Sequence, residues 1–371
     1  MSIIEVKNLV KQFRSPLPAK GGLFPRIKNY LSPCYQTMTA VDHISFSLKP
    51  GERVAFIGPN GAGKSTTIKI LTGIMRPTSG SVTVLNKIPG VQRKSLAYQI
   101  GAVFGQRSQL WYHLPVQETL SLFATIYDIP PLVYRQRLKA LSAKFDLEPL
   151  LYKPVRQLSL GERMRCEVVA SLLHEPAVLF LDEPTIGLDI TAKAIIRDLI
   201  RKQSVEKGVT LLLTSHDTDD IEKVCDRVII IDRGKLLLDD SLSNLKTKYI
   251  RKKVISIVTE EEQIQWDQPT AKILEQSPHH LKLEVDINQH SAEKVISYLL
   301  EKTTIKDLMI EGPALETIIQ TLYTQAHQTE QAEQAEQAYL RDKTDQTHQT
   351  NQIDQTHPAD QPPTDQTHHA Q

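Results

Sequence analysis

Along the first part of the chain, short apolar runs alternate with longer stretches in which apolar residues recur every three or four positions. The runs contain no proline and are typical of buried strands. They lie at residues 53–57, 100–104, 177–181, 210–214 and 228–231. Ile68, Leu71 and Ile74 show the helical spacing. Buried strands that alternate with helices predict an α/β domain, for which we take residues 1–240.

The N-terminal part of this domain contains a predicted insert. Residues 3–13 alternate apolar and polar side chains like a strand, and residues 44–48 fit the next strand. Residues 14–39 between them are rich in proline and glycine and are predicted to be mostly loop. Within the insert, residues 24–31 fit a short helix with Pro25 at its first position and one apolar face. That face suits a membrane surface or a partner helix, and packing on its own domain is an equal alternative.

A helical segment interrupts the alternation of strands and helices. Residues 114–157 carry apolar side chains at helical spacing, with a break at the proline pair 130–131. Ser159 and Glu162 then have the spacing of a capping box at the start of a further helix. Together these features predict a helical subdomain at about 107–175.

Two further segments follow the α/β domain. Residues 241–323 are predicted to be a linker and a small α+β domain. Its strands are expected at 254–258 and 281–287, and its helices at 292–300 and 315–323. The basic stretch 241–253 fits a nucleic-acid patch or an interdomain connector, and the connector is favoured because the net charge is only +1. Residues 324–371 are rich in Gln, Thr and His and almost free of apolar side chains, so we predict a disordered, low-complexity tail.

Composition limits the classes of function. A formal net charge of +1 gives no overall field that favours nucleic acid or an anionic membrane. The three cysteines are far apart, which argues for a reducing compartment and against a disulfide framework. The N-terminus lacks the pattern of a signal peptide, and no apolar run approaches the ~20 residues of a membrane span. We therefore expect a cytosolic protein that would reach a membrane through a partner.

Candidate chemistry is concentrated between the run at 53–57 and the helix after it. The sequence there fits G-x-x-x-x-G-K-[ST], the phosphate-cradling P-loop. A strand, a glycine loop and a helix N-terminus in succession direct backbone N–H groups at an anion. Lys64 would reach the β- and γ-phosphates, and the Ser65 hydroxyl would bind Mg²⁺. The predicted nucleotide-binding residues of this loop are Gly58, Pro59, Asn60, Gly61, Ala62, Gly63, Lys64, Ser65 and Thr66.

Other polar and aromatic residues stand at the ends of predicted strands. Asp182 and Glu183 follow a fully apolar run, and two adjacent carboxylates there are costly unless a cation such as Mg²⁺ is near. His216 follows the next run, on the side of the predicted phosphate site. Phe13 ends the first strand; it either stacks on a nucleotide base or belongs to the core, and both interpretations stay open.

The ordered set of motifs also includes Gln106 after a strand, LSLGE at 158–162 and Gly187-Leu188-Asp189. Over roughly residues 3–240 this set resembles the nucleotide-binding subunit of an ATP-binding cassette (ABC) transporter. The sequence VFGQR at 103–107 resembles the branch that serves multidrug-type, daunorubicin-resistance-like exporters with a separate permease. The resemblance implies a P-loop NTPase fold with a RecA-like core, an antiparallel β subdomain and a helical subdomain, followed by a small α+β domain.

The resemblance implies that ATP and Mg²⁺ are the cofactors and gives residues for both. Phe13 would stack on adenine. Lys64 and the loop amides would hold the phosphates. Ser65 and Gln106 would contact Mg²⁺, and Asp182 would hold the metal through water. Gln106 would also act in catalysis and sense the permease.

The resemblance also implies the residues of hydrolysis and of the subunit interface. Glu183 would polarise the attacking water, and His216 would contact the γ-phosphate; with Lys64 and Gln106 they form the predicted catalytic set. Ser159 and Gly161 would bind the γ-phosphate of ATP held by another subunit, and Asp189 would face that subunit.

The expected partners follow from the single copy of each motif. A complete site needs a P-loop from one cassette and an LSLGE from another, so we expect a dimer, with a homodimer favoured. An integral-membrane permease is the second expected partner, which would place the chain on the inner face of the cell membrane. No nucleic acid is expected. Polysaccharide export is the second substrate class, because its cassettes carry inserts like residues 14–39.

Two rival functions fit the sequence less well. A soluble cassette that acts on nucleic acid or ribosomes usually has two cassettes or a long coiled coil, and this sequence has neither. A degenerate cassette would bind ATP without hydrolysing it, but Glu183 and His216 are both present. The sequence departs from the common LSGGQ pattern, since Leu160 and Glu162 replace Gly and Gln. The role of Glu162 is left open.

Overall fold

The computed structural model describes residues 1–16, 35–105, 108–249, 252–262, 266–286, 291–312, 314–329 and 331–332, and the structural statements below concern these residues. The chain divides at Ile318 into two compact units. The first unit contains a six-stranded, a three-stranded and a four-stranded sheet.

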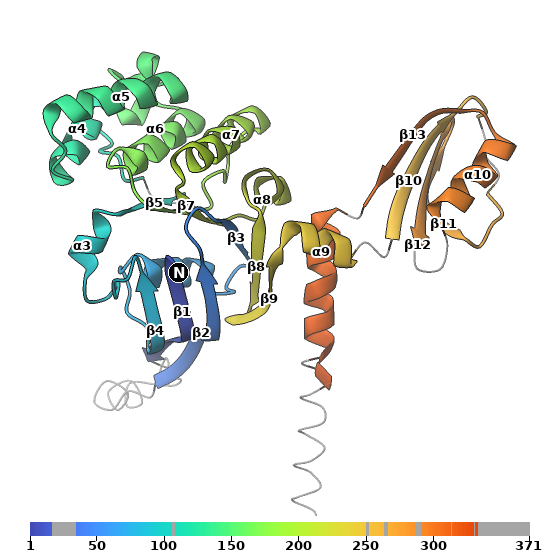
Figure 1. The fold of residues 1–371 in the computed structure, drawn as a ribbon, viewed down its shortest axis with the longest axis horizontal. Helices are drawn as coiled ribbons and strands as arrows, with labels where there is room; N and C mark the ends of the chain where they lie inside the picture. The colour runs from blue at the N-terminus through green and yellow to red at the C-terminus, as the bar shows by residue number, and fades with distance from the viewer. Residues whose placement is uncertain are drawn as a thin grey trace, which may run out of the picture. The chain divides into compact units, whose positions relative to one another are not determined.

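The six-stranded sheet forms the centre of the predicted α/β domain (Figure 1). Its strand order is β5 (Ile100–Phe104), β6 (Val178–Asp182), β7 (Thr210–Thr214), β3 (Arg53–Ile57), β8 (Arg227–Asp232) and β9 (Lys235–Ser241). All neighbouring strands run parallel except β8 and β9. The prediction of buried parallel strands is confirmed. The loops that follow β6, β7 and β3 leave the same edge of the sheet, where α/β proteins bind ligands.

The three-stranded sheet is antiparallel, in the order β2 (Tyr35–Leu48), β1 (Ile4–Pro16) and β4 (Ser79–Val84). It shares one hydrophobic core with the six-stranded sheet and with α2 (Lys64–Leu71). Phe46 of β2 and Phe56 of β3 join the two sheets, with ring centroids 5.6 Å apart. The antiparallel subdomain expected from the resemblance is therefore present.

The predicted insert is shorter than expected. Strand β1 continues to Pro16 and β2 begins at Tyr35, and their register runs through the pair Pro16 and Tyr35. The prediction of loop at the two ends of 14–39 was wrong, because the ladder between β1 and β2 continues into these polar residues. Residues 17–34, and with them the helix predicted at 24–31, lie outside the described residues.

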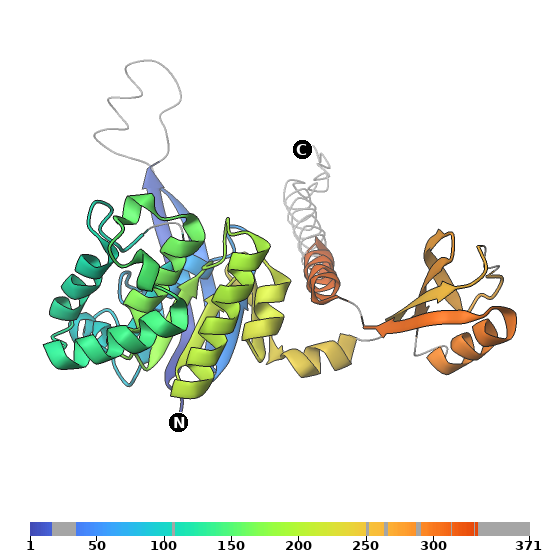
Figure 2. The same ribbon diagram turned by 90° about the horizontal axis from the view of Figure 1, so that it is seen from above.

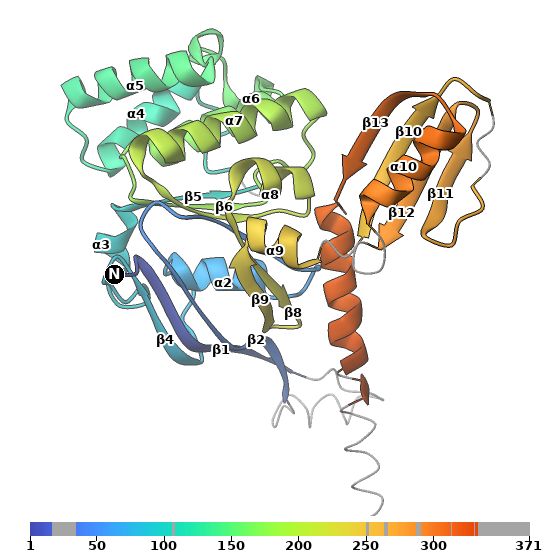
Figure 3. The same cartoon turned by 45° about the vertical axis from the view of Figure 1, so that its right-hand side comes forward.

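Three α-helices lie within the range predicted for the helical subdomain. It contains α4 (Val116–Ile126), α5 (Pro131–Phe145) and α6 (Leu160–Leu172), with short 3₁₀ turns at Glu148–Leu150 and Val155–Gln157. Figures 1 and 3 show these helices on the side of the six-stranded sheet away from β1, β2 and β4. Pro131 begins α5, where its missing N–H costs nothing, and Asp146 ends it in a left-handed conformation.

Four more helices flank these elements: α3 (Arg93–Ala97), α7 (Ile190–Lys207), α8 (Thr218–Val224) and α9 (Leu242–Tyr249). Helix α9 corrects the predicted connector at 241–253. Its first amide, on Leu242, donates to Asp226 O at 2.9 Å, and Lys246 pairs with Glu222 at 2.9 Å. Leu245 is fully buried. The buried side chains of Leu242 and Leu245 pack this segment on the α/β domain, so it is a docked helix and not a solvated connector.

The small α+β domain is an antiparallel sheet in the order β11 (Ala271–Ser277), β12 (His280–Asp286), β10 (Lys252–Thr259) and β13 (Ile305–Glu311). Helix α10 (Ala292–Lys302) covers one face (Figure 3). The prediction missed β11 and β13, because nearly all of their residues are exposed and show no alternation of burial. His279 lies in the turn between β11 and β12 with a φ of 62°.

Residues 315–329 form one helix, drawn in orange-red in Figure 2. The predicted start of the disordered tail at residue 324 is therefore wrong, since glutamine and alanine extend the helix at little cost. Residues 333–371 lie outside the described residues. No helix in the described part of the chain is both long and apolar enough to cross a membrane.

Truncation tests how much the C-terminal residues contribute to stability. Removal of residues 333–371 should leave the midpoint of thermal unfolding unchanged, because this segment has almost no apolar side chains to bury. Removal from residue 315 onward is the matched control, since it also deletes the buried Leu315 and Ile318 and should lower the midpoint. Scanning calorimetry of the three chains compares them. A large loss of stability in the shorter deletion would contradict the prediction.

Candidate active site

The P-loop joins β3 to α2, and two of its glycines are required by packing. A Cβ at Gly63 would lie 2.4 Å from the backbone oxygen of Ala40, and Gly63 has a φ of 104°. A Cβ at Gly58 would lie 2.4 Å from Ile231 O. Gly61 has a φ of 85°, but a Cβ at this position would meet nothing within 4 Å. The loop is thus tightly packed on its inner side and open at Gly61.

Lys64 is the first residue of α2 and is 6% exposed. Its ammonium donates to Gly58 O at 2.6 Å and to Pro59 O at 3.2 Å. Burial lowers the pKa of Lys64, while the charges of Glu183 and Asp182 act in the opposite direction. The loop therefore presents a buried cation beside two carboxylates.

Thr214 joins the two carboxylates to the neighbouring strand. The Thr214 hydroxyl donates to Asp182 Oδ1 at 2.7 Å and accepts the Glu183 amide at 3.1 Å. Glu183 has a φ of 54°, a left-handed conformation that costs about 1 kcal/mol outside glycine. A second hydrogen bond of its amide, to Thr214 O at 3.1 Å, stabilises this turn.

The turn directs the Glu183 carboxylate at His216. Glu183 Oε1 lies 2.6 Å from His216 Nε2. The Glu183 side chain is 15% exposed, while that of His216 is 44% exposed. The carboxylate is therefore largely shielded from solvent, and the imidazole is the more exposed partner of the pair.

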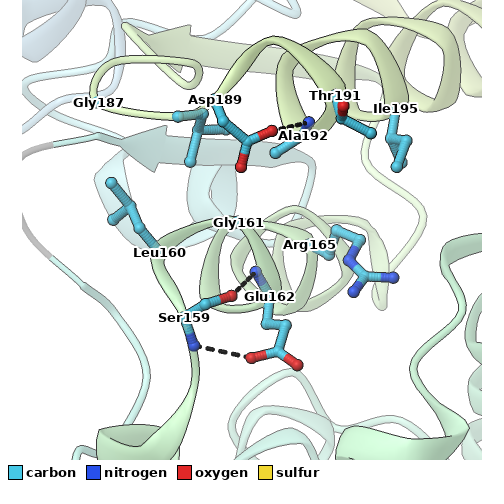
Figure 4. A pocket seen from close by; sticks show the side chains of 11 residues that line it. Ser159, Leu160, Gly161, Glu162, Arg165, Gly187, Asp189, Thr191, Ala192 and Ile195 are labelled. Atoms are coloured by element: carbon cyan, nitrogen blue, oxygen red, sulfur yellow. Dashed lines mark hydrogen bonds between the residues drawn. The ribbon is translucent and has the colours of Figure 1, made fainter.

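A second part of the predicted site is a hollow of ≈ 330 Å³ between the N-termini of α6 and α7 (Figure 4). Ser159 caps α6: its hydroxyl accepts the Glu162 amide at 3.2 Å, and its own amide donates to the Glu162 carboxylate at 2.8 Å. Asp189 caps α7 by accepting the Ala192 amide at 2.8 Å. A Cβ at Gly161 would lie 3.0 Å from the Ala192 methyl, so the two helices approach closely there. No P-loop residue lines this hollow.

The capping box accounts for one departure from the common signature. The carboxylate of Glu162 turns back to the start of its own helix (Figure 4). The Ser159 amide lowers the pKa of Glu162, and Lys153, 3.8 Å away, adds to this effect. The other departure, Leu160, places its side chain against the loop at Gly187, where a Cβ would lie 3.1 Å from a Leu160 methyl.

Comparison with known proteins agrees with this geometry. The family described as "ABC transporter" matches residues 41–186. The linearmycin resistance ATP-binding protein LnrL of Bacillus subtilis (strain 168) is 30% identical over 300 residues, which cover 79% of this chain and 96% of LnrL. This chain belongs to the ATP-binding proteins of ABC transporters.

Another relative and a solved structure extend the comparison. The probable multidrug ABC transporter ATP-binding protein YbhF of Escherichia coli (strain K12) is 35% identical over 223 residues; the match covers 59% of this chain but only 37% of YbhF. A dimeric structure of the ATP-binding cassette MJ0796 in a post-hydrolysis state, bound to ADP and Pi, has a TM-score of 0.54 and 25% identity, and covers 64% of this chain and 98% of that one. The fold expected from the sequence is confirmed.

The ABC cassette brings the predicted residues together in two places. Lys64, Asp182, Glu183 and His216 gather at the edge of the six-stranded sheet, with Ser65 and Thr66 in the first turn of α2. Ser159, Gly161 and Asp189 line the separate hollow. Gln106 lies outside the described residues. These sequence-derived roles stay predictions.

Phe13 lies near the end of β1, opposite Met38 of β2. It is half-buried and does not belong to the buried core. The ammonium of Lys11 stands 5.3 Å from the ring centroid, over one face of the ring. Phe13 is thus outside the buried core, and its stacking on adenine stays a prediction.

Sequence reasoning missed several buried or strand-end polar residues that hold loops of this domain in place. Thr214 is the last residue of a predicted apolar strand. A hydroxyl at that position could have indicated a hydrogen bond to the neighbouring strand, which Thr214 makes to Asp182. Glu167 is 4% exposed and accepts the Ser108 hydroxyl and the Gln109 amide. Asp220 is buried among hydroxyl groups and a guanidinium. No motif marks Glu167 or Asp220 in the sequence.

The packing of the P-loop gives a matched pair of substitutions. Gly63→Ala should destabilise the fold by about 2–4 kcal/mol, from the clash with Ala40 O and the left-handed backbone. Gly61→Ala meets no neighbour and should cost about 1 kcal/mol. Urea unfolding and the binding of a non-hydrolysable ATP analogue measure both effects. Equal stability of the two variants would show that the loop packs differently.

Proposed function

We propose that this chain is the ATP-hydrolysing subunit of an ABC exporter and that it works as a pair of cassettes on a separate membrane permease. The observation that carries the proposal is the division of the site into two separate parts. One part is the cluster of Lys64, Glu183 and His216, and the other part is the hollow lined by Ser159 and Asp189. A second cassette would bring its own hollow to this cluster.

The donor set fits ATP with Mg²⁺. The P-loop supplies backbone amides, a helix N-terminus and a buried ammonium for the phosphates. Asp182 and the Ser65 hydroxyl supply the oxygen atoms that Mg²⁺ prefers, and Gln106 completes the predicted set. Mg²⁺ would neutralise the charge that develops on the phosphates during transfer.

Hydrolysis requires a group that positions the attacking water. Glu183 is suited to this role, because its carboxylate is shielded from solvent and directed at His216. His216 would contact the γ-phosphate and hold the Glu183 carboxylate in place. Lys64 would leave the carbonyl oxygens of its own loop and bind the phosphates.

The hollow between α6 and α7 would bind the γ-phosphate of ATP held by the second cassette. The N-termini of both helices open into it, and Arg165 adds a positive side chain. ATP would hold the two cassettes together, and loss of the γ-phosphate contacts would release them. A homodimer is the simplest arrangement, since each motif occurs once in the chain.

The export direction and the permease are proposed from the relatives, whose names include multidrug transport and linearmycin resistance. The chain would lie on the cytoplasmic face of the cell membrane, bound to the permease. Tyr112 lies in the segment between β5 and α4 and is 53% exposed. Its exposed aromatic side chain suits such a contact.

Substitution of the proposed catalytic base tests hydrolysis and dimerisation together. Glu183→Gln should still bind ATP but hydrolyse it at least about a hundredfold more slowly, because the amide is not a base. It should therefore accumulate as a dimer with Mg²⁺-ATP, measured by light scattering and phosphate release.

The control for this experiment is the double variant Glu183→Gln with Lys64→Ala, which should remain a monomer because it cannot hold the phosphates. If Glu183→Gln hydrolyses ATP at the parent rate, the assignment of the base is wrong. If it stays monomeric with ATP and the permease present, the division of the site between two chains is wrong.

Co-purification tests the proposed partner. The tagged full-length chain, isolated from detergent-solubilised cells, should retain a polytopic membrane protein identified by mass spectrometry. Tyr112→Glu should weaken this capture severalfold, because a charge would replace an aromatic contact. Val205→Glu, at a side chain of 58% exposure near the end of α7, is the control and should not change it. Ribosomes or DNA in place of a membrane protein would contradict the transport function.

A further inference from the structure

Two sets of hydrogen bonds join the loops that carry Glu183 and His216. The first set is made by the Thr214 hydroxyl at the ends of the strands. The second set is made by Asp220 of α8, which is 1% exposed and contacts both loops beyond the strands. Asp220 does not belong to the predicted nucleotide site, and the proposed chemistry does not use it.

The carboxylate of Asp220 receives two hydroxyl groups on the same oxygen. The Ser215 hydroxyl donates to Asp220 Oδ2 at 2.5 Å, and the Thr185 hydroxyl donates to the same atom. Ser215 directly precedes His216, and Thr185 follows Glu183 by two residues. Both hydroxyl groups are buried. One carboxylate oxygen therefore connects the loop of the base to the loop of the histidine.

The other carboxylate oxygen of Asp220 is paired with a buried cation. Asp220 Oδ1 accepts Arg197 Nε from α7, and the Arg197 side chain is 7% exposed. The guanidinium also contacts Asp217 at 2.9 Å and Asp219 at 3.4 Å, and Lys193 contacts Asp217 at 2.7 Å. Arg197 and Lys193 thus pair with Asp220 and with two further carboxylates, Asp217 and Asp219, so the buried carboxylate has a cation beside it.

Thr185 also has a backbone contact with the turn that leads to Asp189, in the second part of the site. The Leu188 amide donates to Thr185 O at 3.2 Å, and Leu188 directly precedes Asp189. Asp189 begins α7, the helix that also supplies Arg197. Fixing Thr185 therefore fixes the turn between Glu183 and Asp189 at its middle.

We propose that Asp220 is a positioning residue for ATP hydrolysis, which acts through the Thr185 and Ser215 hydroxyl groups to hold the Glu183 carboxylate against His216. This inference rests on the proposed function, in which Glu183 is the base. Asp220 touches neither nucleotide nor water in this role. A displacement of a catalytic group by about 1 Å is enough to slow a reaction by about a hundredfold.

Removal of a single hydroxyl tests the connection and leaves the buried ion pair intact. Thr185→Val keeps the shape of the side chain, and it should lower kcat for ATP hydrolysis by about ten- to a hundredfold with little change in KM. Thr185→Ser restores the hydroxyl and should recover most of the parent kcat. Ser215→Ala removes the other hydroxyl and should lower kcat in the same way, which keeps the test valid if Thr185→Val does not fold.

Asp219→Asn is the matched control, because the Asp219 side chain is on the same helix, is 61% exposed and pairs with Arg197 and Lys223 rather than with Thr185 or Ser215. It should hydrolyse ATP at the parent rate. All rates are expressed per folded molecule, with the folded fraction taken from unfolding curves. The inference would be overturned if both Thr185→Val and Ser215→Ala had the kcat of the parent protein. It would also be overturned if their loss of kcat disappeared once the rates were corrected for the folded fraction.

A double variant separates this inference from the proposed function. If Thr185 acts through Glu183, Thr185→Val added to Glu183→Gln should cause no further loss of the residual rate. A further tenfold loss would show that the hydroxyl acts elsewhere. Parent activity of Glu183→Gln alone would instead refute the proposed base, whatever the Thr185 variants do.

Discussion

The parallel register of β6, β7 and β3 is the constraint on which the site depends. It brings Asp182 level with Thr214, so that the Thr214 hydroxyl bonds the first carboxylate and receives the amide of the second. The strained backbone of Glu183 is tolerated because β6 and β7, which precede the two loops, are paired within the sheet. Without this register, the carboxylates, the histidine and the P-loop would not meet at one edge.

The site also depends on the termini of three helices. Helix α2 begins in the P-loop, while α6 and α7 begin at the separate hollow and are each capped by a side chain. A helix N-terminus attracts an anion only over its first turn. The two groups of termini therefore act at two places on the cassette, which is why a complete site calls for two chains in the proposed function.

Local sequence predicted the parts of this arrangement that depend on local interactions. The apolar runs gave the central strands, and Ser159 with Glu162 gave the capping box, because both depend on residues close in the chain. Contacts between distant residues were not predictable. Thr185 and Asp220 are 35 residues apart, and only the fold brings them together. Strands β11 and β13 were missed because exposed strands carry no alternating pattern.

The departure from the common signature is explained by local electrostatics. A carboxylate at residue 162 adds a negative charge beside a hollow proposed to bind an anion. The structure compensates for it, since the Ser159 amide and Lys153 both interact with Glu162, and Arg165 lines the same hollow. Glu162 also completes the cap that begins α6, and a negative charge in the first turn stabilises that helix. Glu162 thus stabilises the N-terminus of α6, and its negative charge is directed at the Ser159 amide at the start of that helix.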